Sequence, residues 1–217
     1  MSYKLCIDLC SGLGGFSAAF RDAGWEVVTV DIDPKFKPTI CRDITKLSIE
    51  ELESYLPSPL RLHWNPFVVL ASPPCERFSV ASHAWPKVGI QKALEMVGAC
   101  LEIVAKMKPD KWLLENPMGR LRWILGSPSM TLRLSDFGSQ YRKLTDFWGN
   151  IPIPMVEGMR QHTAYVANRM PGFNRLPRPT NDASKKALMP YGLSQAVLEA
   201  VSMDPQAQPK SMEAGTK

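Results

Sequence analysis

Residues 4–31, KLCIDLCSGLGGFSAAFRDAGWEVVTVD, contain the pattern that decides the fold. A short apolar run, Lys4–Leu9, leads into the glycine turn SGLGG, and a helical stretch follows at Phe16–Ala23. Glu26–Val30 is rich in β-branched residues and predicts a second strand, which ends in Asp31. A strand, a glycine turn, a helix and a second strand with an acid at its tip are typical of a nucleotide-binding βαβ unit.

The alternation of strands and helices continues downstream. Phe67–Ala71 predicts a buried strand that runs into Ser72–Cys75, and the apolar spacing from Ile90 to Val104 predicts a helix. Trp112–Leu114 predicts the next strand, with Glu115–Pro117 at its exit. This order predicts an α/β fold with a mostly parallel sheet and helices on both faces. Residues that do chemistry then gather beyond the carboxyl ends of the strands.

The domain organisation follows from a change of character after about residue 150. We expect residues 1–150 to form a catalytic, cofactor-binding domain, and residues 151–189 a small irregular basic arm rich in proline and arginine. Helical spacing returns in residues 190–203, which predicts a helix that completes the catalytic domain. The polar residues 204–217 predict a disordered tail.

Composition narrows the class of protein. The 217 residues suffice for one domain with a full core, and no apolar run approaches the length of a membrane span. The N-terminus has no signal-peptide pattern, so we expect a cytoplasmic protein, encoded by a prokaryote or a phage, without membrane contact. Five cysteines with no CxxC pair argue against both a disulfide framework and a metal site.

Charge indicates a polyanionic partner. The chain carries a net charge of +5, and an equal excess lies in residues 158–186, where six basic residues oppose only Asp182. A solvated basic loop would have the same composition. The six residues are Arg160, Arg169, Arg175, Arg178, Lys185 and Lys186.

Two acids indicate an adenosine-containing cofactor. The turn SGLGG departs from GxGxxG, so a dinucleotide is not the expected ligand. Asp31 suits the two hydroxyls of a ribose, and Asp43 could accept a hydrogen bond from an adenine amino group. Each acid alone also fits an ordinary turn.

Cys75 and Glu115 are the candidates for chemistry. Cys75 follows two prolines directly after a strand, which fixes the backbone and presents the thiol as a nucleophile. Glu115 leaves the neighbouring strand and is followed by Asn116-Pro117; burial there would raise its pKa and suit it to act as an acid. A buried structural thiol and a strand-end carboxylate are the alternatives.

Together these motifs resemble the DNA cytosine-5 methyltransferases. The matching segments, in family order, are DLCSGLGGFSAAFRDAGW, VDIDP, CRDI, SPPCERFS, LLENP, GSQYRK and PYGLSQAVLEAV. The resemblance covers about residues 4–150 and 187–202. It implies a Rossmann-like S-adenosylmethionine-dependent methyltransferase fold, S-adenosylmethionine as cofactor (S-adenosylhomocysteine as its product), and DNA as partner, with the target base flipped out of the duplex.

The resemblance also assigns residues. It implies the catalytic residues Cys75, Glu115, Asn116 and Arg142. It implies the cofactor-binding residues Asp8, Leu9, Cys10, Gly12, Leu13, Gly14, Asp31, Ile32, Asp43, Ile44, Ser72, Pro74 and Ser194. It implies the substrate-binding residues Ser79, Ser82, Gln140, Arg142, Arg160 and Arg169. By the family mechanism Cys75 adds to carbon 6 of cytosine, Glu115 donates to N3, and Arg142 holds the carbonyl oxygen.

Four departures stand against the family pattern. Cys10 replaces a phenylalanine, Leu144 replaces a second arginine, and Leu193 replaces an asparagine. The fourth is the missing target-recognition domain, which makes this a short form. We therefore expect short or relaxed sequence specificity, or a partner protein that supplies recognition.

Three alternatives stay open at this point. The same chemistry could act on RNA or on a free cytidine nucleotide. A non-catalytic nucleic-acid-binding regulator would keep the fold. A cysteine hydrolase would need a histidine base, for which the chain offers His63, His83 and His162.

Overall fold

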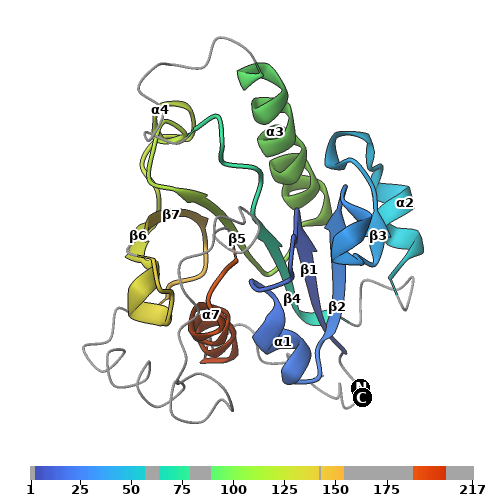
Figure 1. The fold of residues 1–217 in the computed structure, drawn as a ribbon. Helices are drawn as coiled ribbons and strands as arrows, with labels where there is room; N and C mark the ends of the chain where they lie inside the picture. The colour runs from blue at the N-terminus through green and yellow to red at the C-terminus, as the bar shows by residue number, and fades with distance from the viewer. Residues whose placement is uncertain (1–2, 57–63, 79–88, 142, 154–187, 204–217) are drawn as a thin grey trace, which may run out of the picture.

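The computed structural model describes residues 3–56, 64–78, 89–141, 143–153 and 188–203 (Figure 1). In this part of the chain the strands form one seven-stranded sheet in the order β3-β2-β1-β4-β5-β7-β6. Strands β1 to β5 pair in parallel, whereas β7 is antiparallel to both β5 and β6. The strands are β1 (Tyr3–Leu9), β2 (Glu26–Asp31), β3 (Ile40–Cys41), β4 (Trp64–Ala71), β5 (Lys111–Pro117), β6 (Met130–Arg133) and β7 (Leu144–Gly149).

Helices cover both faces of the sheet, as predicted. Figure 1 shows α1 and α7 together on one face and α2 and α3 on the other. The helices are α1 (Ala18–Asp22), α2 (Ile49–Ser54), α3 (Ile90–Met107), α4 (Arg122–Leu125) and α7 (Tyr191–Met203), with short 3-10 turns η1 (Pro34–Phe36), η2 (Ile44–Lys46) and η4 (Leu134–Phe137).

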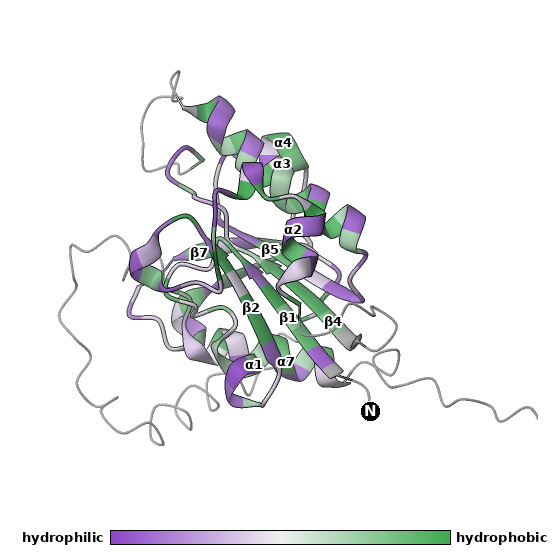
Figure 2. Cartoon of the chain, turned by 90° about the vertical axis from the view of Figure 1, so that its right-hand side faces the viewer, coloured by the Kyte–Doolittle hydropathy of each residue, from purple (hydrophilic) through white to green (hydrophobic). Residues whose placement is uncertain are grey.

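Two apolar clusters hold the layers together, because successive strand side chains point to opposite faces. Val28 and Val30 of β2 pack in the cluster under α3, whereas Val27 packs against the cluster under α7. Figure 2 shows the largely hydrophobic strands β2, β1 and β4 between the two helical layers. The mostly parallel α/β fold predicted from the sequence is therefore confirmed.

Local patterns predicted several elements well. Helices α3 and α7 lie where their apolar spacing predicts them. Ser48 caps α2 by accepting a hydrogen bond from the amide of Glu51 at 3.1 Å. Helix α1 is shorter than the predicted Phe16–Ala23, because Ser17 lies before it and donates to the buried Asp8.

One expectation near the end of the sheet needs correction. Strand β5 extends to Pro117, so Glu115 and Asn116 lie within the strand rather than at its exit, because β7 pairs with them from the other side. The described ends of the predicted irregular arm, residues 151–153 and 188–189, form no helix or strand, and Ile151, Ile153 and Met189 are buried in the cluster under α7. Residues 154–187 and 204–217 lie outside the described residues, so the predicted domain boundaries stay a prediction.

Candidate active site

The carboxyl ends of β1, β2, β4 and β5 meet around one cavity of ≈ 410 Å³. Six segments distant in the chain contribute to its wall, and four of them lie at the ends of these strands, because parallel strands end at the same edge of the sheet. The lining residues are Cys10, Ser11, Gly12, Leu13, Gly15, Phe16, Asp31, Ile32, Asp33, Lys35, Phe36, Ser72, Pro73, Pro74, Cys75, Glu76, Glu115, Lys143, Leu188 and Met189.

The glycine turn forms one side of this cavity and holds Asp31. The amide of Gly12 donates to Oδ2 of Asp31 at 2.8 Å, and the amide of Asp33 donates to Oδ1 at 2.9 Å. Gly12 has a φ of +50°, which favours glycine. At Gly15 an added Cβ would lie 2.6 Å from Cδ1 of Leu188, so glycine allows the segment before α7 to approach the turn.

The wall residues fit an adenosine-containing cofactor. Asp31 offers a carboxylate for a ribose diol, and Ile32 and Phe36 offer apolar surface beside it. The Oγ atom of Ser72 is buried and has no hydrogen-bond partner among the described residues. An unpaired buried hydroxyl in a cavity wall is what a polar ligand would satisfy.

Cys75 and Glu115 lie in the wall of the same cavity. Burial raises the pKa of the half-buried Cys75 thiol; the Lys143 cation opposes this, and the Glu115 and Glu76 carboxylates add to it. Burial likewise raises the pKa of Glu115, against the opposing charge of Lys143, and Asp146 adds to the rise. A carboxyl group of this kind keeps its proton to a higher pH and suits an acid.

Asn116 is bonded to the loop before Cys75 and is not among the residues that line the cavity. Its side-chain amide donates to the carbonyl oxygen of Pro73 at 3.1 Å and ties β5 to the loop before Cys75. The carbonyl of Cys75 accepts from the amide of Phe78, which closes the loop into a turn. Cys75 lies in the loop after β4 and Glu115 lies in β5, and the Asn116 bond adds to the pairing of these two strands.

Among the wall residues that the sequence did not predict, Phe36 and Lys143 add chemistry to the site. Phe36 brings an aromatic ring to the wall. Cys10, which directly follows β1, is small, whereas the family pattern has a phenylalanine at that position. Lys143 brings a cation, with its Nζ atom 3.6 Å from Oε1 of Glu115. Neither had a usable signal: the pairing of β7 decides the face on which Lys143 lies, and η1 places Phe36.

The structure does not bring all predicted cofactor residues into the cavity. Asp8 and Leu9 are buried, and Oδ2 of Asp8 accepts from Ser17 at 2.6 Å. Ser194 is buried and joins α7 to the start of α1, accepting from Ala19 and donating to Phe16. These side chains act beneath the site, where burial and internal hydrogen bonds hold them.

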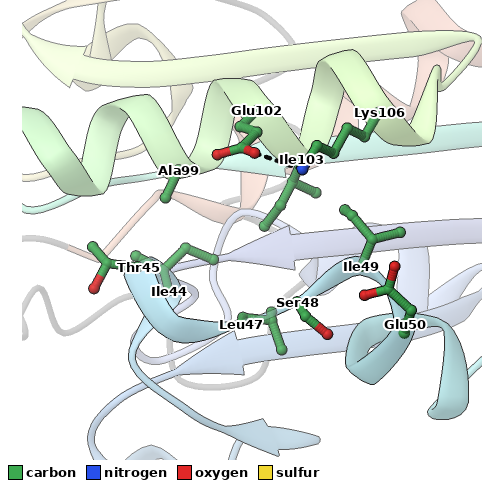
Figure 3. A pocket seen from close by; sticks show the side chains of 10 residues that line it. All are labelled: Ile44, Thr45, Leu47, Ser48, Ile49, Glu50, Ala99, Glu102, Ile103 and Lys106. Atoms are coloured by element: carbon green, nitrogen blue, oxygen red, sulfur yellow. Dashed lines mark ion pairs between the residues drawn. The ribbon is translucent and has the colours of Figure 1, made fainter.

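Asp43 and Ile44 also lie away from the cavity wall. The Asp43 carboxylate caps η2, accepting from the amide and the hydroxyl of Thr45 at 3.1 and 2.9 Å. Ile44 lines a separate groove of ≈ 300 Å³ between η2, α2 and α3, in which Figure 3 shows the Lys106–Glu102 ion pair. Gly14 belongs to a third, polar cavity behind the glycine turn.

The predicted substrate residues are mostly not described. Gln140 is exposed and absent from the cavity wall. Leu144 is exposed. Leu193 of α7 is fully buried and fills the hydrophobic core at a position where the family has a polar side chain. Ser79, Ser82, Arg142, Arg160, Arg169, His63, His83 and His162 lie outside the described residues.

Neither a metal-binding cluster nor a membrane-spanning helix is present among the described residues. They include no group of three or more His, Cys, Asp and Glu side chains that could hold a metal ion. They include no helix that is long and apolar enough to cross a membrane.

Comparison with known proteins agrees with this geometry. Residues 5–121 match the C-5 cytosine-specific DNA methylase family. The "Probable DNA (cytosine-5)-methyltransferase" of Frog virus 3 is 30% identical in an alignment of 191 residues that covers 79% of this chain and 79% of the viral protein. The "Type II methyltransferase M1.HphI" of Haemophilus parahaemolyticus is 28% identical in an alignment of 121 residues that covers 51% of this chain and 31% of that protein.

One solved structure is similar over half its own length. S. pombe Dnmt2 methyltransferase shares 17% identity at a TM-score of 0.45, covering 67% of this chain and 50% of that one. The chain likewise spans under a third of the bacterial relative, whereas it spans most of the viral one. The match over residues 5–121 and the viral relative show that this chain belongs to the C-5 cytosine-specific DNA methylase family and is an enzyme of that type.

Proposed function

We propose that the protein transfers a methyl group from S-adenosylmethionine to carbon 5 of cytosine in DNA, through a covalent bond to Cys75. One observation carries this proposal. Cys75 and Glu115 line a single cavity whose other wall is the glycine turn and Asp31. A nucleophile, an acid and a cofactor-binding surface therefore share one space.

Cys75 activates a base that is otherwise a poor nucleophile at carbon 5. Its thiolate forms a bond to carbon 6, and the displaced electron pair makes carbon 5 enamine-like while Glu115 donates a proton to N3. S-adenosylmethionine, when bound, supplies an electrophilic methyl group. Carbon 5 would take that methyl group as the methyl–sulfur bond of the cofactor breaks, and it would then lose its proton to solvent. The electron pair of that carbon–hydrogen bond would restore the double bond between carbons 5 and 6 and expel the Cys75 thiolate from carbon 6, while N3 returns its proton to Glu115.

The position of Cys75 favours a flipped base. The thiol is half-buried and Glu115 is buried, so both act inside the cavity rather than on the protein surface. Carbon 6 and N3 of a paired cytosine are inaccessible within a stacked duplex. Extrusion of the base into this cavity would bring the ring between the two side chains.

The internal length of the chain supports short or relaxed specificity. Only about forty residues, 151–190, stand where the family keeps its target-recognition domain, and several of them are arginines. Arginines that contact phosphates give affinity and steep salt dependence rather than base discrimination. Bisulfite sequencing of methylated random DNA should show many sites, whereas a single defined site of four or more base pairs would refute this part.

Trapping on 5-fluorocytosine tests the covalent step. Fluorine at carbon 5 cannot leave as the proton does, so the protein should accumulate as a covalent adduct on duplex DNA in the presence of S-adenosylmethionine. Cys75→Ser should give no adduct, because serine is a far weaker nucleophile at neutral pH. Cys41→Ser, which changes an exposed thiol outside the cavity wall, is the matched control and should trap normally.

The same assay decides the substrate. Duplex DNA, RNA and a cytidine nucleotide, each carrying the fluorinated base, should be offered side by side. Trapping on DNA alone supports the proposal, and trapping on RNA or nucleotide alone reassigns the substrate. An adduct that survives Cys75→Ser would overturn the covalent mechanism.

A further inference from the structure

Lys143 lies on the same face of the sheet as Glu115. Glu115 pairs with Phe147 and Pro117 pairs with Thr145 across β5 and β7. The Lys143 carbonyl accepts from the amide of Leu134, which continues the β6–β7 pairing beyond the strand ends. Because side chains alternate along an extended segment, residues 147, 145 and 143 face one way, toward the side that carries Glu115.

The side chain of Lys143 reaches back over the cavity. Its Nζ atom lies 3.6 Å from Oε1 of Glu115, with exposed fractions of 24% and 6% for the two side chains. That separation is an ion pair rather than a hydrogen bond. Lys143 and Cys75 line the same cavity, and the Lys143 charge lowers the pKa of the Cys75 thiol against the effect of burial.

Among the described residues, Lys143 is the cation that opposes the effect of burial on the pKa of both Cys75 and Glu115. Glu115 and Glu76 disfavour a charged Cys75, whereas Lys143 favours it. Asp146 disfavours a charged Glu115, and Lys143 favours it. Arg142, which directly precedes Lys143, lies outside the described residues.

We propose that Lys143 is a positioning residue of this site, whose ammonium group stabilises the Cys75 thiolate and holds the Glu115 carboxyl group toward the cavity. The proposal rests on the proposed methyl transfer for its biological meaning. Its physical content concerns three side chains of the free protein: Lys143, Cys75 and Glu115. A cation close to a partly desolvated thiolate makes that thiolate more abundant near neutral pH.

Alkylation of Cys75 by iodoacetamide tests the inference without any methyl transfer. The reagent reacts with thiolate, so the rate at Cys75, resolved by mass spectrometry across pH 6–10, reports the ionised fraction. Lys143→Met should move this profile to higher pH by about half to one and a half units, a loss of roughly 3–30-fold in rate at pH 7.5. Lys143→Arg should restore most of the rate, because it keeps the charge.

Two controls separate electrostatics from general damage. Lys106→Met removes a lysine from an ion pair with Glu102 in the groove of Figure 3, and Cys75 should then react as in the unmodified protein. The exposed Cys41 serves as an internal reference whose rate should not change in any variant. If Lys143→Met does not fold by circular dichroism, Lys143→Gln takes its place.

The outcome is distinguishable from failure of the proposed function. A Cys75 profile unchanged by Lys143→Met or Lys143→Gln would overturn the role of Lys143, whatever the enzyme does. Methyl transfer that survives Cys75→Ser would overturn the covalent mechanism and leave the alkylation result standing. As a second readout, the acid-side limb of the pH profile for methyl transfer should move upward with the alkylation profile, and an unmoved limb counts against the role.

Discussion

Replacement of Asp31 by asparagine should weaken binding of S-adenosylmethionine by about 10–150-fold. Asp31 lines the cavity, and its two oxygens already accept from the amides of Gly12 and Asp33. The carboxylate is thus held in place with acceptor capacity left for a ribose. A hydrogen bond to a charged group contributes about 1.5–3 kcal/mol, which corresponds to that range of dissociation constants.

Asparagine keeps the shape of the side chain but has only one acceptor oxygen. Its amide nitrogen must face one of the two backbone amides, so the turn should lose roughly 1 kcal/mol of stability as well. A thermal unfolding scan measures that loss separately from binding. Asp31→Ala removes both acceptors and should bind the cofactor no better than Asp31→Asn.

The assay is isothermal titration calorimetry with S-adenosylmethionine. Glu26→Gln is the matched control. Glu26 is exposed at the opposite end of the same strand, β2, and its replacement by glutamine removes one negative charge, as Asp31→Asn does. It should bind the cofactor within about twofold of the unmodified protein. A folded Asp31→Asn protein with an unchanged dissociation constant would refute the placement of the cofactor.

Three further predictions concern catalysis and stability. Glu115→Gln should slow methyl transfer to duplex DNA by roughly 10²–10⁴, the usual effect of losing a positioned acid, and a rate within threefold of normal would exclude that role. Asp146→Ala removes a fully buried carboxylate that binds two nitrogens of Arg122. The free energy of unfolding, measured in urea, should fall by about 2–3 kcal/mol, a value kept low because Arg122 is partly exposed. A fall under about 0.5 kcal/mol would contradict the reasoning. Burial raises the pKa of Asp8 from 3.8 to about 7, so its folded form resists ionisation; stability should fall as pH rises from about 4 to 7, by on the order of 3–4 kcal/mol. Asp8→Asn should flatten that fall in urea unfolding at pH 5 and pH 8, and an equal slope in both proteins would count against it.

Local sequence was sufficient to predict the first half of the sheet and the position of Cys75. The turn SGLGG, the apolar periodicity of α3 and α7, and the Ser48 cap each depend on neighbours a few residues away. Asp31 and Cys75 could be placed at the cavity for the same reason, since a residue at the carboxyl end of a parallel strand has its position decided by the strand itself.

The structure decided which of the other predicted side chains face the cavity. Asp8 belongs to the glycine-turn motif by sequence, yet its position in β1 directs it to Ser17 in the interior. Asp43 has the right spacing for a cofactor contact, but the amide of Thr45 recruits its carboxylate to cap η2. Hydrogen bonds and burial depend on partners distant in the chain or on local turns that spacing does not reveal.

The placement of Lys143 shows the limit most clearly. In sequence it is one more basic residue after GSQYR, and nothing nearby marks it as different from its neighbours. The antiparallel pairing of β7 with β5, across about thirty residues of chain, sets the register that brings it to Glu115. A slip of one residue in that register would turn it to the opposite face. Sequence by itself therefore determined the family chemistry and the elements that carry Cys75 and Glu115, whereas long-range strand pairing decided the electrostatic surroundings in which they act.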